Sequence, residues 1–241
     1  MTVPGKSEVN FEFIPLNWDT KYFGISCARI NLTGPADEAE QEEIIKICSR
    51  YDFVTIANLY NRKENNLWIG TKTNAFLTDI NIQFVRKTDC KPQTEGGRPD
   101  DKCTADNADS FGKGYRIELC SNYSGDIRLL DIAGEAFKYS RFFNDPFLPA
   151  DLAGNIYREW CRQAFVREDK YFAIYFKENE PAGFLLFNLD KKSKESSIEL
   201  IAVGQKHAGQ GIGKALLGAC DSFCAGQGAA VLRVGTQADN L

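Results

Sequence analysis

The sequence has too few histidines and too few paired cysteines for a metal centre. It contains one histidine, His207, among 241 residues. A structural zinc site needs four ligands at regular spacing, and the one close cysteine pair, Cys220 and Cys224, has no second pair to complete such a set. We therefore expect no metal in this protein.

The chain also lacks an excess of basic charge and a long apolar segment. Its 29 Lys and Arg residues stand against 33 Asp and Glu residues, which gives a net charge of −4. No basic field therefore attracts a phosphate backbone or an anionic membrane surface. No apolar run is long enough for a spanning helix, and Met1 to Asn10 lack the apolar core of a signal peptide. We predict a cytoplasmic protein that binds neither nucleic acid nor membrane.

Residues 89–114 divide the chain. They contain almost no apolar side chains and many Gly, Pro, Asp and Lys residues, so they cannot bury enough surface to offset their ordering entropy. We interpret them as a polar linker or insertion between a domain at 1–88 and a domain at 115–241. Cys90 and Cys103 lie in this segment and could close a loop, but the scattered cysteines are expected to be mostly reduced thiols.

The N-terminal domain shows the alternating patterns of a small α/β fold. Residues 11–33 alternate apolar and polar positions around an Asn-Trp-Asp turn, which predicts two strands joined by a loop. Acidic residues followed by an apolar stripe predict a helix over 35–50. Two further short runs, 52–58 and 79–87, predict strands of the same domain.

The second domain is predicted to begin with a strand and to continue with helices before a three-stranded meander. Helical periodicity and alternation of apolar residues separate these elements along the chain. The expected order is a strand at 115–120, helices over 125–139 and 152–167, two hairpin strands within 171–190 and a third strand at 196–203.

The third meander strand leads into a glycine-rich turn and a helix. Gly209, Gly211 and Gly213 let a ligand approach the main chain at a helix N-terminus, where unpaired N–H groups and the macrodipole favour an anion. Lys214 adds a positive charge to the turn. The dinucleotide-binding fingerprint requires glycine at this position, so the turn does not match that motif. Ala215 stands where a P-loop has Ser or Thr. A turn whose glycines serve only close packing is the alternative.

This turn and its setting resemble the GCN5-related N-acetyltransferase (GNAT) family, whose [QR]-x-x-G-x-[GA] motif lies between its fourth strand and third helix. Ala208 departs from the Gln or Arg of the motif. Three blocks, PLNWDTKYFGI at 15–25, SRFFNDPFLPADLAGNIYREW at 140–160 and LRVGTQADN at 232–240, resemble the dTDP-fucosamine acetyltransferase subgroup. The resemblance implies an α/β (α+β) class protein, a GNAT fold with a mixed, mainly antiparallel sheet after a small α/β domain.

The resemblance implies acetyl-CoA as co-substrate and assigns residues to it. The end of the meander strand would bind the pantetheine as an added strand, with a main-chain N–H near Val203 facing the developing oxyanion. The turn would bind the pyrophosphate, and Asn240 would lie in reach of the coenzyme. The implied coenzyme residues are Ile201, Ala202, Val203, Ala208, Gly209, Gln210, Gly211, Ile212, Gly213, Lys214 and Asn240.

Candidate catalytic and acceptor-binding residues are fewer. Glu199 would steer the amine or deprotonate it through water, although an acidic residue on a strand often only belongs to the face that is exposed to solvent. Arg141 and Phe142 would contact a sugar nucleotide through phosphate and ring, or would be a surface arginine and a packed phenylalanine. His207 lies on the phosphate side of the coenzyme and is interpreted as a surface residue.

The chain stops at Leu241, where the resembled family begins a fourth helix, two closing strands and the Tyr that acts as general acid. Either the chain is truncated or another group or chain substitutes, and we expect an exposed sheet edge that favours a homodimer. The leading hypothesis is acetylation of a dTDP-4-amino-4,6-dideoxyhexose by direct attack in a ternary complex. The alternatives are a GNAT enzyme for protein or small-molecule amines and an inactive GNAT-like binding protein.

Overall fold

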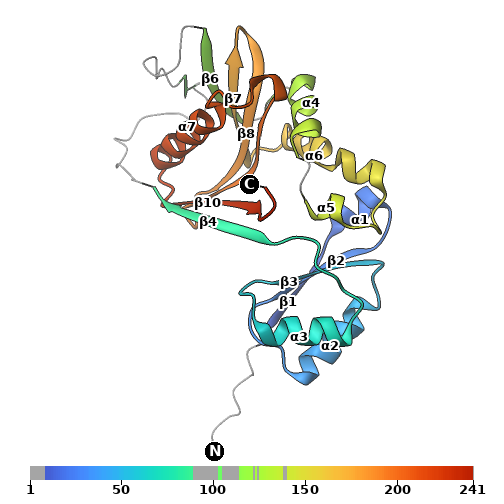
Figure 1. The fold of residues 1–241 in the computed structure, drawn as a ribbon. Helices are drawn as coiled ribbons and strands as arrows, with labels where there is room; N and C mark the ends of the chain where they lie inside the picture. The colour runs from blue at the N-terminus through green and yellow to red at the C-terminus, as the bar shows by residue number, and fades with distance from the viewer. Residues whose placement is uncertain are drawn as a thin grey trace, which may run out of the picture. The chain divides into compact units, whose positions relative to one another are not determined.

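The structure is a computed structural model that describes residues 9–88, 103–104, 114–121, 123, 125–137 and 140–240. The chain forms two compact units, Met1–Leu77 and Thr78–Leu241 (Figure 1). Most of the predicted linker at 89–114, including Cys90, lies outside the described residues. Of the helices that are described, none is both long and apolar enough to cross a bilayer.

The first unit contains a three-stranded sheet flanked by helices. Strand β2 pairs antiparallel with β1 and parallel with β3. The core contains Ile30 and Leu32 of β2, Ile44 of α2 and Trp68 of α3. The elements are β1 (Phe11–Pro15), α1 (Asn17–Phe23), β2 (Cys27–Leu32), α2 (Glu38–Cys48), β3 (Phe53–Asn58) and α3 (Lys63–Lys72).

Helix α1 occupies the segment where a loop is predicted from the sequence. It has seven residues, too few for an apolar period to distinguish a helix from a turn. Asp19 lies in its first turn, where an acid stabilises the helix, and Gly24 ends it with a φ of 71°. The two strands predicted on either side of this segment are present, and they pair with each other.

Helix α2 begins at a capping box. The Asp37 carboxylate accepts from Glu40 N at 2.9 Å, and Asp37 N donates to the Glu40 carboxylate at 2.9 Å. Asp37→Ala removes the acceptor, so we expect it to lower the free energy of unfolding by about 1 kcal/mol. Asp37→Asn keeps a capping oxygen and serves as the control. Urea titration measures both variants, and equal losses in the two would contradict a capping role.

The second unit is built on one mixed sheet with the strand order β4-β10-β9-β8-β7-β6-β5. Every neighbouring pair is antiparallel except β9 and β10, which are parallel. This agrees with the predicted mixed, mainly antiparallel sheet. The strands are β4 (Asn81–Lys87), β5 (Cys103–Thr104), β6 (Tyr115–Ser121), β7 (Lys170–Lys177), β8 (Glu180–Asp190), β9 (Glu195–Val203) and β10 (Val231–Gln237).

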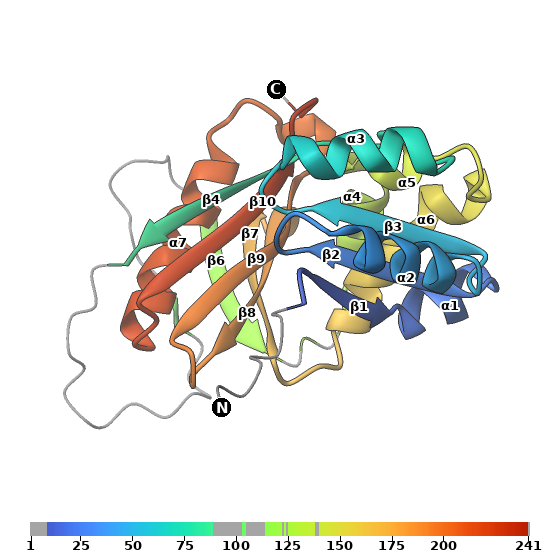
Figure 2. The same cartoon turned by 90° about the horizontal axis from the view of Figure 1, so that it is seen from below.

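Strand β4 is assigned from the sequence to the first domain, but it pairs along its whole length with β10 (Figure 2). The boundary between the units therefore precedes β4, at Leu77, and not residue 88. Alternation shows that a segment is a strand but not which strand it joins. β4 is an edge strand of this sheet, and Ile82, Phe84 and Val85 on it are exposed.

Helices cover both faces of the second sheet. α7 packs on one face against β7, β8 and β9, and α4 packs on the opposite face together with α6 (Figure 1). The short helix α5 lies between the helices predicted over 125–139 and 152–167, where no helix is predicted from the sequence. The helical elements are α4 (Ile127–Ala136), α5 (Arg141–Asn144), α6 (Ala150–Ala164), the single 3₁₀ turn Gln205–His207 and α7 (Ile212–Gly226).

Candidate functional site

The parallel strands β9 and β10 separate part-way along their length. Their pairing ends at Val234 and Ile198, although β9 continues to Val203 and β10 continues to Gln237. On its other side β9 stays paired with β8 as far as Gly183 and Val203. The last five residues of β9 therefore have one hydrogen-bonding edge that none of the described strands covers.

A cavity of about 740 Å³ lies at this separation. It is lined by both separated strands, by β4 and by residues of α4, α5 and α6. The lining residues are Asn81, Gln83, Glu135, Ala136, Phe137, Arg141, Phe142, Tyr157, Trp160, Ser197, Ile198, Glu199, Leu200, Ile201, Ala202, Val203, Gln205, Arg233, Val234, Gly235, Thr236, Gln237 and Asn240. Seven predicted site residues are among them, whereas those of the glycine-rich turn are not.

The glycine loop, residues 208–214, is open to solvent at the start of α7. Gly209 and Gly211 have φ values of 75° and 77°, a backbone region that favours glycine. Within the described residues, no backbone carbonyl accepts a hydrogen bond from the N–H groups of residues 209–214. A Cβ added at Gly209 or Gly213 would meet no atom within 4 Å. The loop therefore presents free donors and open space to an anion.

The side chains of the glycine loop differ in what they can contact. Ile212 is 2% exposed and belongs to the core between α7 and the sheet, so only its main chain can reach a ligand. Gln210 accepts from Lys177 Nζ at 3.1 Å and donates to the Lys206 carbonyl at 3.3 Å. Lys214 is exposed, as is Ala208. The predicted pyrophosphate contact at this loop thus relies on main-chain donors and a nearby cation.

Glu199 lies in the wall of the cavity at a β-bulge. Leu186 of β8 pairs with Leu200, but the next residue, Phe187, pairs with Ile198, so Glu199 is the extra residue of β9. Its carboxylate accepts from Trp160 Nε1 at 3.2 Å and forms an ion pair with Lys170. The Glu199 carboxylate is therefore held by protein groups, and it is not simply a solvent-exposed side chain of the strand.

Aromatic side chains form another part of the cavity. We call Phe137, Phe142, Tyr157 and Trp160 the aromatic wall. The Tyr157 ring stacks on Phe137 with centroids 4.4 Å apart and on Trp160 at 6.3 Å, and burial raises the pKa of Tyr157. Sequence reasoning named only Phe142, because the other three are indistinguishable from core residues on an amphipathic helix.

Arg141 is in the cavity beside this wall. Its guanidinium carbon lies 4.3 Å from the centre of the Phe142 ring. Its Nε is buried, and no acceptor for it is found in the described part of the chain. A buried donor without an acceptor is costly, so a ligand oxygen at this position would be favourable.

Two predicted positions lie near the edge of the site. Asn240 lines the cavity, and its side-chain amide donates to Thr236 Oγ1 at 3.0 Å. His207 is partly exposed in the turn before the glycine loop and does not line the cavity. No group of three or more His, Cys, Asp and Glu side chains is arranged for a metal ion within the described ranges.

Residues 133–241 match the model of the acetyltransferase (GNAT) family. This part of the chain is a GNAT domain. It contains the separated strands, the glycine loop and nearly all the lining of the cavity. The predicted GNAT fold is confirmed, and so is the predicted enzyme class, an acetyl-CoA-dependent N-acetyltransferase. No curated protein matches the chain.

Solved structures resemble the chain at low sequence identity. A functionally unknown conserved protein from Staphylococcus epidermidis has a TM-score of 0.55 and 12% identity, covering 97% of this chain and 82% of its own. A GCN5-related N-acetyltransferase from Kribbella flavida has a TM-score of 0.49 and 14% identity, and the match covers 87% of this chain and 71% of that protein. The ribosomal-protein-S18-alanine N-acetyltransferase of Escherichia coli has a TM-score of 0.38 and 19% identity, and the match covers 52% of this chain and 69% of that protein. The likeness to the Staphylococcus epidermidis protein concerns the fold alone.

Proposed function

We propose that this GNAT enzyme acetylates the amine of a nucleotide-linked amino sugar of the dTDP-4-amino-4,6-dideoxyhexose type. The observation that carries the proposal is the cavity at the separation of β9 and β10. It extends to Gln205, three residues before the open glycine loop, and its other walls present an aromatic surface and the Arg141 guanidinium. One groove can therefore bring a coenzyme and a phosphate-bearing acceptor together.

Acetyl-CoA supplies the activated acetyl group as a thioester. The free N–H groups of residues 209–214 are suited to its diphosphate, and Lys214 adds a positive charge there. The uncovered edge of β9, from Glu199 to Val203, is suited to the amides of the pantetheine, as in strand addition. The main-chain N–H near Val203 would stabilise the negative charge that develops on the acyl oxygen.

The acceptor would occupy the part of the cavity beside α5 and α6. Arg141 would bind a phosphate oxygen through its unpartnered Nε, and the aromatic wall would contact the sugar or the base. Glu199 would accept a hydrogen bond from the amine. These roles require an acceptor that carries both an amine and an anionic group.

Calorimetry with coenzyme A, followed by a thiol-release assay, tests this function. We expect binding of coenzyme A, and release of thiol from acetyl-CoA with dTDP-4-amino-4,6-dideoxygalactose in preference to the free amino sugar or a peptide amine. Equal activity on peptide amines would favour an enzyme for proteins or small amines. Binding of coenzyme A without turnover of any amine would favour an inactive binding protein.

Arg141→Gln is expected to raise the KM for the nucleotide sugar about tenfold or more, because a hydrogen bond to a charged group contributes about 1.5–3 kcal/mol. Coenzyme A affinity is expected to stay unchanged. Arg162→Gln on α6 is the matched control, since Arg162 is exposed, pairs with Glu159 and does not line the cavity. An equal rise of KM in both variants would show that Arg141 does not bind the acceptor.

A further inference from the structure

Glu199 is held by donors from three different elements. The carboxylate oxygen Oε1 accepts from Asn188 Nδ2 of β8 at 3.2 Å and forms the ion pair with Lys170 Nζ of β7. Oε2 accepts from Trp160 Nε1 of α6 at 3.2 Å. The side chains of Glu199 and Lys170 are each 13% exposed. This pair is therefore shielded from water on most sides.

The donors are distributed unequally around the carboxylate. An ionised carboxylate offers about four acceptor positions. Two donors reach Oε1, whereas Oε2 receives only the Trp160 indole among the contacts described, which leaves it one acceptor position. Glu199 and Trp160 line the cavity, but Lys170 and Asn188 do not. Lys170 thus neutralises Glu199 from outside the cavity. The open acceptor position is on Oε2, the oxygen that is bound by Trp160 of the cavity lining.

Other charged residues near this pair have partners of their own or belong to the lining of the cavity. Asp169 is 3.8 Å from Lys170 Nζ, and it pairs with Arg167 at 2.7 Å. Arg233 is bound by Glu195 through two hydrogen bonds. Glu135 and Arg141 are further charged residues in the lining. Lys170 is accordingly the cation that contacts Glu199 in the described part of the chain.

We propose that Lys170 is a positioning residue, which holds the Glu199 carboxylate in the orientation in which its Oε2 accepts a hydrogen bond from the acceptor amine. Removal of either charge of the pair leaves the other one shielded and without its counter-charge, which is unfavourable. The catalytic part of this inference rests on the proposed acetyl transfer, but the position of the carboxylate can be tested without any substrate.

The indole of Trp160 reports on the carboxylate that it contacts. The chain has three tryptophans, Trp18, Trp68 and Trp160, so a proton–nitrogen correlation spectrum has three indole signals, and Trp160→Phe assigns the relevant one. The signal is recorded at one neutral pH in the wild type and in the variants. Lys170→Met removes the group that holds the carboxylate in place against this indole, so the Trp160 signal should move.

We expect the Trp160 indole signal in Lys170→Met to move away from its wild-type position and toward its position in Glu199→Gln, while the signals of Trp18 and Trp68 stay in place. Lys170→Arg should keep the wild-type Trp160 signal. A Trp160 signal that is the same in the wild type and in Lys170→Met would overturn the proposal. Failure of the sugar-nucleotide assay leaves these spectra unaffected, so the two proposals fail separately.

A second measurement covers the case in which Lys170→Met unfolds. The double variant Lys170→Met with Glu199→Gln buries neither charge. It should therefore have a higher thermal midpoint than Lys170→Met alone. A double variant that is no more stable than Lys170→Met would show that the two charges do not depend on each other, which contradicts the proposal.

Discussion

Gly213→Asp is expected to weaken the binding of coenzyme A about a hundredfold, while Gly218→Asp on the same helix leaves it unchanged. A side chain fits at both positions, because an added Cβ meets no atom within 4 Å and neither glycine has a positive φ. Gly213 is in the first turn of α7, beside the free N–H groups, whereas Gly218 is near the middle of the helix. The pair therefore separates a change at the loop from a change to the helix.

The size of this effect follows from charge repulsion. A carboxylate about 5 Å from one negative charge of the diphosphate costs about 3 kcal/mol at an effective dielectric constant of about 20. That energy corresponds to about a hundredfold in Kd. An acid in the first turn of a helix stabilises the helix, so the loss is not due to unfolding. Calorimetry with coenzyme A measures both variants. Unchanged binding by Gly213→Asp would show that the glycine loop does not bind the coenzyme.

The glycine loop could be found from the sequence because its function depends on neighbours in the chain. A strand, three alternating glycines and an apolar helix are contiguous, and free N–H groups at a helix start follow from helix geometry alone. The structure adds that Gly209 and Gly211 have positive φ values and that the loop is open to solvent. That the loop binds the coenzyme stays a prediction.

The rest of the candidate site depends on residues that are distant in the sequence. The β-bulge at Glu199 exists only in the register between β8 and β9, and its counter-ion Lys170 comes from β7. No local pattern specifies either. The pairing of β4 with β10 was missed for the same reason, and it brings Asn81 and Gln83 to the cavity from a strand assigned to the other domain.

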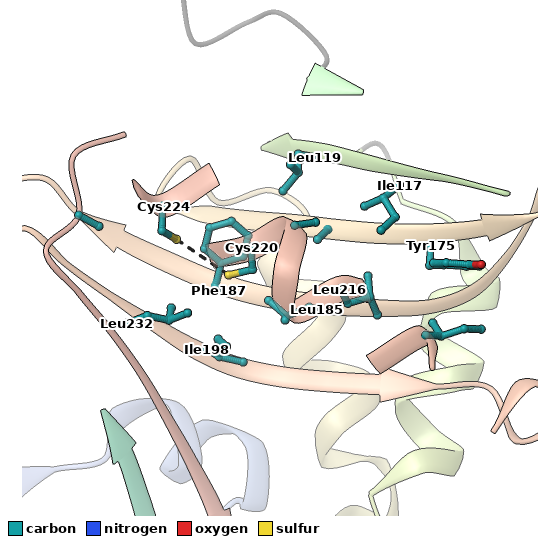
Figure 3. Packing of buried hydrophobic residues seen from close by; sticks show 14 of the residues in the cluster. Ile117, Leu119, Tyr175, Leu185, Phe187, Ile198, Leu216, Cys220, Cys224 and Leu232 are labelled. Atoms are coloured by element: carbon teal, nitrogen blue, oxygen red, sulfur yellow. Dashed lines mark hydrogen bonds between the residues drawn. The ribbon is translucent and has the colours of Figure 1, made fainter. Parts of the chain in front are cut away.

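Phe187→Ala is expected to lower the free energy of unfolding by about 3–5 kcal/mol, the cost of removing a buried aromatic side chain and leaving a cavity. Phe187 of β8 is fully buried (Figure 3). Its ring centroid lies 5.5 Å from that of Tyr171 on β7 and 5.7 Å from that of Phe223 on α7. The substitution therefore weakens one of the contacts that hold α7 against the sheet.

Phe147→Ala is the control for this prediction, because Phe147 is 76% exposed and the same atoms are deleted. Urea titration should show a loss of less than about 1 kcal/mol for it, as for most surface substitutions. Since α7 carries the free N–H groups at its start, we expect Phe187→Ala also to bind coenzyme A more weakly, and saturating coenzyme A to recover part of its thermal midpoint. A cost for Phe187→Ala as small as that of the control would mean that α7 is not held by this aromatic contact, and that the glycine loop is positioned by other parts of the core.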